Sequence, residues 1–329
     1  MTPADLSRTV LGAVRRAVEE GALVGPVAVP EKVTVERPRP GGRGDYATNA
    51  ALRLARDAGM PAVRVAEVLG EQLVRHPLIS GVEVTGPGFL NITLVSGADG
   101  SLVRTVLEQG GRYGYGQSMA GERCVYRHCA EVRAAVMTDA LRRLAFAQGA
   151  VVRVGAEGAA IEVRPVPAGA GAGELLRRFG ADATRWALLR AAAHDRPKLD
   201  DGLLVQGESS PFFRVRYAHS RARALVRAAE RLAVPVSHEE TVDAPALLGA
   251  VGDYPRVLVS AARHRAPDRL ARHLETTADA FLGFQHTVLP RGDEKPSAAH
   301  RSRLALAEAA GTVLAGGLSL LGISAPEYV

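Results

Sequence analysis

Arginine and tyrosine side chains at helical spacing form the first group of residues in this chain that is suited to chemistry. Arg214, Tyr217 and Arg221 follow a helix start at Ser210-Pro211, at intervals of three and four residues, so they lie on one side of the predicted helix. Arginine binds phosphates and an aromatic ring stacks on bases, and an open RNA loop offers both. The alternative is a face that only contacts water. His219 lies on the apolar stripe and is interpreted as a core residue.

A second group lies on a strand predicted over residues 89–95. Alternation along this strand places Leu90 and Ile92 on one face and Phe89 and Asn91 on the other. A nucleic-acid base stacks on such a ring and bonds to such an amide, so the pair predicts an RNA contact. In the alternative interpretation Phe89 packs under a helix and Asn91 faces water.

Three polar or aromatic residues stand at the start of a helix predicted over residues 46–56. The carboxylate of Asp45 suits the N-cap of this helix, because it accepts from a free backbone N–H of the first turn. Tyr46 and Asn49 are predicted as further RNA contacts. Together with the two groups above, they complete the predicted RNA-binding set.

Catalytic and metal-binding patterns are weak by comparison. Cys124, His128 and Cys129 offer two thiols and one imidazole, but no clear fourth ligand completes a zinc site. No Ser/His/Asp or Cys/His arrangement has local support. The sequence therefore predicts no catalytic residue, no metal and no cofactor.

The elements that position these groups divide the chain into three parts and predict the α+β class. Residues 1–97 read as a small α/β domain whose last two strands form a hairpin around Gly86-Pro87-Gly88. Residues 98–172 have room for one short βαβ unit, followed by a Gly/Ala linker. Residues 173–329 read as an all-α helical bundle.

Composition supports a globular chain with a mild affinity for polyanions. Apolar residues make up 47% and charged residues 23%, and the net charge is +6. The excess of arginine over lysine suits phosphate binding, or it reflects a GC-rich genome. Two cysteines and no evident signal or membrane-spanning segment predict a cytoplasmic protein that contacts no membrane.

Two blocks near the N-terminus and three near the C-terminus resemble one known family. Gly44–Ala51 and Val82–Asn91 resemble the N-terminal additional domain of arginyl-tRNA synthetases, which docks on the tRNA elbow. Gly180–Arg185 resembles the Asp-Ala-Leu-Arg signature of their anticodon-binding domain, with threonine in place of leucine. Arg216–Arg221 and Gly317–Glu327 resemble later parts of that domain. Val329 stands where the family has a terminal methionine near the anticodon.

The middle of the chain departs from the family pattern. Counting back from Asp139–Leu144 places His128-Cys129-Ala130-Glu131 at the family's ATP-binding His-x-Gly-His, so glycine and the second histidine are replaced. Ala168–Gly173 stands where a lysine-bearing signature loop is expected. The resemblance therefore predicts a degenerate catalytic-domain remnant and a chain that is not an enzyme, descended from an arginine–tRNA ligase.

We therefore hypothesise that the chain is a non-catalytic, synthetase-like protein. It binds tRNA, chiefly tRNA-Arg, through its two terminal domains. Two alternatives stay open. One is a protein-interaction or regulatory scaffold that has lost RNA binding, and the other is the tRNA-binding subunit of a split synthetase. The expected partners are tRNA and, in the alternatives, another protein.

Overall fold

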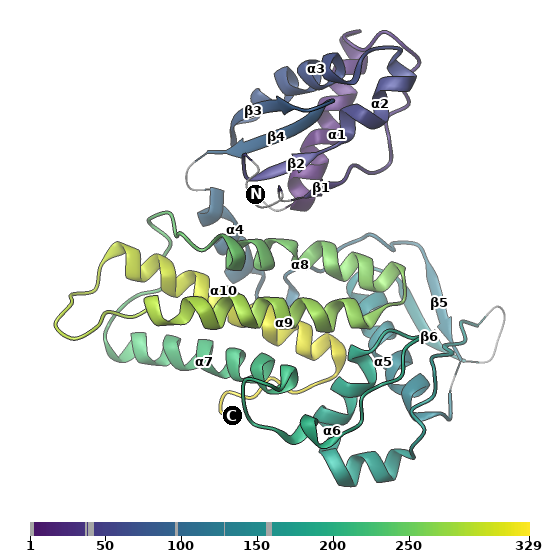
Figure 1. Ribbon diagram of the computed structural model, residues 1–329, viewed down its shortest axis with the longest axis vertical. Coiled ribbons are helices and arrows are strands. Elements are labelled where there is room, and N and C mark those ends of the chain that lie inside the picture. The colour runs from purple at the N-terminus through teal and green to yellow at the C-terminus, as the bar shows by residue number, and fades with distance from the viewer. Residues whose placement is uncertain (1–2, 37, 39–42, 96–97, 128, 156–159) are drawn as a thin grey trace. The chain divides into compact units, whose positions relative to one another are not determined.

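The computed structural model describes residues 3–36, 38, 43–95, 98–127, 129–155 and 160–329 (Figure 1). Two compact units form, Met1–Leu102 and Val103–Val329. The first combines helices with an antiparallel sheet, and the second is mainly helical with two short parallel strands. The predicted α+β class is therefore confirmed.

The N-terminal unit is a four-stranded antiparallel sheet with helices on one face (Figure 1). Its elements are α1 (Pro3–Glu19), β1 (Val35–Glu36), β2 (Tyr46–Thr48), α2 (Ala50–Ala58), α3 (Ala62–Val74), β3 (Ile79–Thr85) and β4 (Phe89–Leu94). The strand order is β1-β2-β4-β3. Leu6 and Val10 of α1 are fully buried in one cluster with Leu69 of α3 and with Leu90 and Ile92 of β4. This cluster holds the sheet against the helices.

The predicted hairpin is present as β3 and β4. Thr85 pairs with Phe89, and the backbone N–H of Gly88 donates to the Thr85 carbonyl at 3.3 Å. Gly88 has a φ of 129°, and a Cβ there would lie 2.9 Å from the backbone of Ala62. Only glycine meets both conditions, so this residue lets the hairpin approach α3.

The helix predicted over residues 46–56 begins later than expected. Tyr46–Thr48 forms strand β2, because it pairs with β1 on one side and with β4 on the other. The helix starts at Ala50, and Asn49 at its N-cap makes no side-chain cap bond. The prediction of Asp45 as a helix cap is also wrong, because its carboxylate accepts from the backbone N–H of Leu94 at 2.7 Å.

The second unit continues from α4 (Ala98–Gln109), which crosses the boundary between the units. It contains the short 3-10 helix η1 (Gly110–Arg112), then β5 (Arg123–Tyr126), α5 (Val132–Ala147) and β6 (Val151–Val154). The remaining elements are α6 (Ala172–Arg190), η2 (Asp201–Leu204), α7 (Pro211–Arg231), α8 (Pro245–Arg263), α9 (Pro267–Phe284), η3 (Gln285–Thr287) and α10 (Ala298–Leu321).

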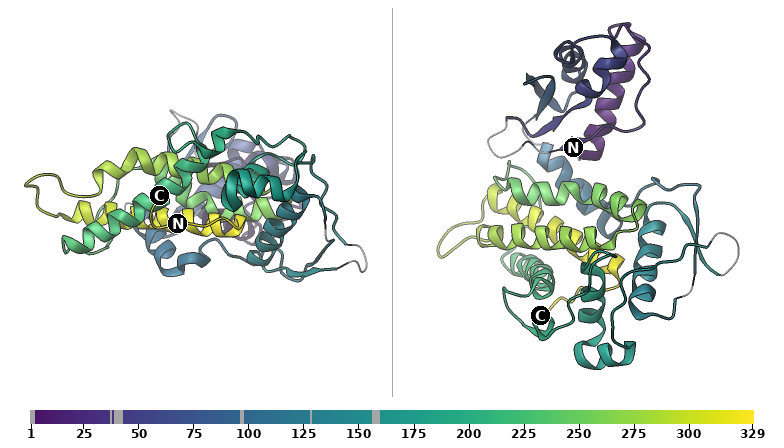
Figure 2. Two further views of the ribbon diagram at one scale, coloured as in Figure 1. Left: turned by 90° about the horizontal axis from the view of Figure 1, so that it is seen from below. Right: turned by 45° about the vertical axis from the view of Figure 1, so that its right-hand side comes forward.

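Helices α7 to α10 lie side by side and form the bundle predicted for the C-terminal part (Figures 1 and 2). Ala222 of α7 approaches α10 so closely that a Cβ at Gly311 would lie 3.0 Å from the alanine methyl. Within the described residues α10 alone is long and apolar enough to cross a membrane, and 72% of that apolar window is buried inside the protein. We therefore interpret α10 as a core helix of the bundle.

Strands β5 and β6 pair in parallel across α5, which gives the short βαβ unit predicted for the middle of the chain. One fully buried side chain of α5 fastens this unit to α6 and to the segments on either side of α6. Arg133 donates to the carbonyls of Leu188 at the end of α6, of Ala191 and Ala192 just after it, and of Val166 and Asp195, at 2.6–3.1 Å. The guanidinium thus satisfies carbonyls that the helix end leaves free.

Candidate nucleic-acid interface

The predicted RNA-binding residues of the C-terminal part lie together on one side of α7. Ser210 caps the helix, because its hydroxyl accepts from the N–H of Phe213 at 3.3 Å. The neighbouring side of the helix, which includes Phe212, Val215 and Ala218, is buried in the bundle. This packing fixes the rotation of α7, so Tyr217 and Arg221 are exposed.

Contacts with neighbouring side chains hold this face in place. The ring of Tyr217, 37% exposed, lies parallel to that of Phe213 with centroids 5.6 Å apart. Arg221 donates from Nε to the Gln285 side chain at 2.7 Å, and no partner for its terminal nitrogens is found among the described residues. Arg214 is paired with Asp279 at 2.8 Å, so part of its charge is already neutralised. Tyr217 and Arg221 are therefore the strongest candidates on this face for binding a base and a phosphate.

The C-terminal tail lies along another side of α7. His219 is 4% exposed and donates from Nδ1 to the carbonyl of Pro326 at 3.0 Å, so its interpretation as a core residue is confirmed. The carboxylate of Glu327 pairs with Arg227 at 2.8 Å and with Arg223 at 3.4 Å. Val329, at the position of the family's terminal methionine, is 53% exposed.

Phe89 and Asn91 share the sheet face opposite the helices but differ in availability. Phe89 is 41% exposed. Asn91 is 8% exposed, and its amide nitrogen donates to the hydroxyl of Thr85 at 2.8 Å. Across from Asn91 stands Glu83, whose carboxylate pairs with Arg43 at 3.0 Å. Because this face carries a carboxylate, it suits stacking on a base better than binding a phosphate.

Tyr46 and Asn49 do not lie together, although they are close in sequence. Tyr46 is 3% exposed and belongs to the core of the N-terminal unit, so its ring offers no surface to RNA in this structure. Asn49 is exposed and lines a cavity of about 250 Å³ with Lys32 and Arg53. Sequence reasoning missed these two cations. The spacing of four residues between Asn49 and Arg53 was the available signal, because it places both on one side of a helix.

The stretch compared with the ATP-binding tetrapeptide is described except for His128. Glu131 is the N-cap of α5, and its carboxylate accepts from the N–H of Ala134 at 2.7 Å and from that of Ala168 at 3.1 Å. Burial acts to raise the pKa of Glu131, but these hydrogen bonds and the Arg133 charge together lower it. Glu131 is therefore an anion that caps a helix and fixes the segment at Ala168.

The two thiols differ in their burial. Cys124 is buried, and burial raises the pKa of its thiol. Cys129 is half-buried. Among the described residues no group of three or more His, Cys, Asp or Glu side chains is arranged to hold a metal ion.

Both units match models of known protein families. Residues 6–94 match the arginyl-tRNA synthetase N-terminal domain, and residues 215–329 match the DALR anticodon binding domain. The first match covers the sheet with Phe89, and the second begins on α7 and covers Tyr217, Arg221 and the tail. These matches define a protein of the aminoacyl-tRNA synthetase type that carries an anticodon-binding domain.

Individual relatives agree with the family models. An arginine–tRNA ligase of Frankia alni is 27% identical over 555 positions that span 99% of this chain and 100% of the relative. One of Renibacterium salmoninarum is 40% identical over 163 residues, 46% of this chain and 30% of the relative. The fold is similar to that of Thermus thermophilus arginyl-tRNA synthetase, with a TM-score of 0.72, 14% identity and 100% of both chains covered. The chain belongs to the arginyl-tRNA synthetase family.

These comparisons overturn the prediction that the chain is not an enzyme. The relatives named arginine–tRNA ligase align with nearly the whole chain and with their own full length, which points to an enzyme. The replaced tetrapeptide does not establish a loss of catalysis, because its position was counted from one neighbouring helix. The Frankia alignment extends over 555 positions against 329 residues here, so that relative has segments without a counterpart in this chain.

Proposed function

We propose that the protein binds tRNA, chiefly tRNA-Arg. This binding serves arginine–tRNA ligation, the activity given in the names of its relatives. The DALR unit contacts the anticodon stem-loop through the exposed face of α7. The N-terminal unit contacts the tRNA elbow through Phe89 and through the cavity at Asn49, Lys32 and Arg53. Of the residues predicted from sequence, Tyr46 and Asn91 are left out because both are buried.

One observation carries this proposal: the face of α7 presents an aromatic ring and a guanidinium that neighbouring side chains already hold in place. Phe213 fixes the ring of Tyr217, and Gln285 fixes Arg221. Side chains that are ordered before binding lose less conformational entropy when an RNA loop docks. A stacked base and a paired phosphate each match one of these two groups.

Binding of labelled tRNA-Arg, compared with a generic RNA duplex of equal length, tests the proposal. We expect tighter binding of tRNA-Arg, and a loss of about fivefold to a hundredfold in Tyr217→Ala, which is the range of one stacked base. Arg221→Gln should weaken binding and reduce the slope of affinity against salt concentration by about one unit.

Arg142→Gln is the matched control, because Arg142 is exposed on α5 and has no described hydrogen bond or ion pair. It removes the same charge outside α7 and should leave tRNA affinity nearly unchanged. Equal affinity for tRNA-Arg and the duplex, or equal losses in Arg142→Gln and Arg221→Gln, would refute specific binding through α7.

Ligation needs a separate measurement. The purified chain is incubated with ATP, tRNA-Arg and labelled arginine, and acid-insoluble label is counted. Transfer above the level without protein supports the ligase part of the proposal. Binding of tRNA without transfer rejects ligation by this chain and leaves tRNA binding in place.

A second candidate function, the tRNA-binding subunit of a split synthetase, is favoured by one feature of the βαβ unit. In the described residues β6 has a single strand neighbour, β5, and Val151 and Val154 on β6 are about half exposed. An open strand edge accepts a strand from another chain. Co-purification of a separate polypeptide that increases arginine transfer would support this candidate, and full transfer by the chain alone would exclude it.

A further inference from the structure

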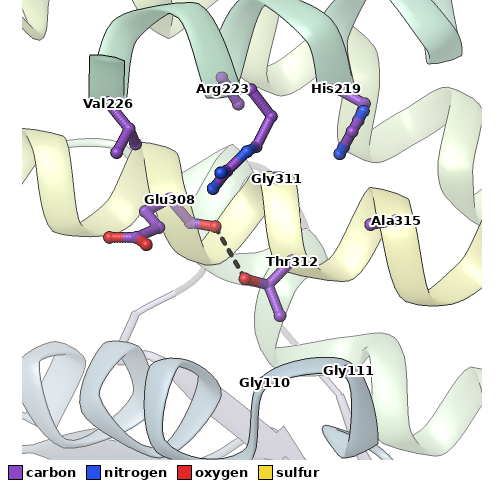
Figure 3. Close-up of a pocket in the computed structure, with 10 residues that line it drawn as sticks. Gly110, Gly111, His219, Arg223, Val226, Glu308, Gly311, Thr312 and Ala315 are labelled. Carbon is purple, nitrogen blue, oxygen red and sulfur yellow. Dashed lines mark hydrogen bonds between the residues drawn. The ribbon is translucent and has the colours of Figure 1, made fainter. Parts of the chain in front are cut away.

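A small cavity lies in the helical unit between α7, α10 and the turn η1 (Figure 3). Its volume is about 250 Å³, below the range of about 300–1,000 Å³ typical of sites for drug-sized ligands. His219 and Arg223 line it from α7, and Glu308 and Thr312 line it from α10. It includes none of the residues of the α7 face proposed for RNA.

Two opposite charges in this cavity are not joined to each other. In the described part of the chain the Glu308 carboxylate has no hydrogen bond or ion pair, although Arg223 also lines the cavity. Arg223 contacts the Glu327 carboxylate through Nε at 3.4 Å, and no partner is found for its two terminal nitrogens among the described residues. Burial raises the pKa of Glu308, which indicates that Arg223 only partly compensates its charge. A ligand that carries both signs would satisfy both groups.

A neutral acceptor and a wall of small residues complete the cavity. Because Nδ1 of His219 donates to Pro326, its Nε2 keeps a lone pair, and burial lowers the pKa of the ring, so the neutral form predominates. In Figure 3 the ring projects from α7 toward the cavity. A Cβ at Gly111 of η1 would meet no atom within 4 Å, so the space beside this residue is open.

We propose that this cavity binds a free α-amino acid, whose carboxylate pairs with Arg223 and whose ammonium group binds Glu308. The volume matches a small molecule better than a nucleotide or a peptide, and the two unjoined charges favour a zwitterion over a simple amine or a simple acid. The site is separate from the exposed RNA-binding groups, so it does not depend on the proposed tRNA binding.

Calorimetric titration of the full chain with each of the twenty standard α-amino acids tests the proposal. At least one should saturate the protein with a Kd of about 1 mM or lower. Propylamine and propionate, which each carry one of the two charges, should bind at least about tenfold more weakly than that amino acid. Failure of all twenty to saturate below about 10 mM would overturn the proposal.

Four variants locate the binding. Glu308→Gln and Arg223→Gln should each weaken it about tenfold or more, and Gly111→Val should abolish it by filling the open space. Arg227→Gln is the matched control, because Arg227 holds Glu327 as Arg223 does but does not line the cavity. Gly111→Val adds its side chain where nothing lies within 4 Å, so a native thermal transition is expected. Undiminished binding to a folded Gly111→Val variant, or equal losses in the two arginine variants, would refute this site.

Discussion

Replacing Arg133 by methionine should destabilise the helical unit more than any other single change in the βαβ unit. The guanidinium makes five hydrogen bonds to carbonyl oxygens, and the side chain is fully buried. Each hydrogen bond of a charged group contributes about 1.5–3 kcal/mol to stability. The effects of losing all five are not additive, because the carbonyls at the end of α6 can bind water in the variant. We expect the free energy of unfolding to fall by about 4 kcal/mol.

Urea unfolding followed by tryptophan fluorescence measures this loss in the right unit. Trp186 is the single tryptophan of the chain, is 1% exposed, and lies two residues before Leu188, whose carbonyl accepts from Arg133. Arg142→Met on the exposed side of α5 is the control and should change the free energy by less than about 0.5 kcal/mol. A loss below about 1 kcal/mol in Arg133→Met would show that the carbonyls find other partners and would refute the reasoning.

Three further predictions concern titrating and glycine residues. Glu308→Gln should raise the free energy of unfolding by about 0.5 kcal/mol at neutral pH, because a carboxyl group with a raised pKa in the folded state destabilises the protein as the pH rises. The gain is small because water screens this half-exposed group. Urea unfolding below pH 4.5 should show no gain. Burial lowers the pKa of His273 from 6.5 to about 4, so the free energy of unfolding of the wild type should fall by about 3 kcal/mol as the pH falls from 6.5 to 4. A difference in unfolding free energy between the wild type and His273→Phe that stays constant over this range would contradict the prediction. Gly88→Ala should speed amide hydrogen exchange in β3 and β4, because the added methyl group meets the Ala62 backbone and the φ of residue 88 is positive. Gly81→Ala is the control and should leave the exchange unchanged, because a Cβ at residue 81 meets no atom within 4 Å.

Periodicity and turn residues were enough to predict most of the fold. The Gly86–Gly88 hairpin and the helix after Ser210-Pro211 each follow from a local pattern, and each is present. The start of α2 was missed because Tyr46 is drawn into a strand by pairing with β4, which lies more than forty residues further along the chain. A short segment shows no sign of such a partner in its own sequence.

The candidate site was predicted in part, for a related reason. The spacing of Arg214, Tyr217 and Arg221 on one helix placed them on one face correctly, since helical geometry decides that alone. Spacing did not reveal that Asp279 neutralises Arg214, or that Lys32 lies beside Asn49, because these contacts join separate elements. Counting placed Glu131 at the second histidine of an ATP-binding tetrapeptide, but its carboxylate caps α5.

The anchoring of Arg133 has a consequence for how this protein is divided experimentally. The DALR match begins at residue 215, but the carbonyls that Arg133 binds belong to residues 166–195, and the compact unit begins at Val103. A fragment cut at the edge of the homology would discard the α5 arginine together with α6. The boundaries recognised by sequence similarity are thus narrower than the smallest piece expected to fold independently, and expression of isolated halves should start from Val103.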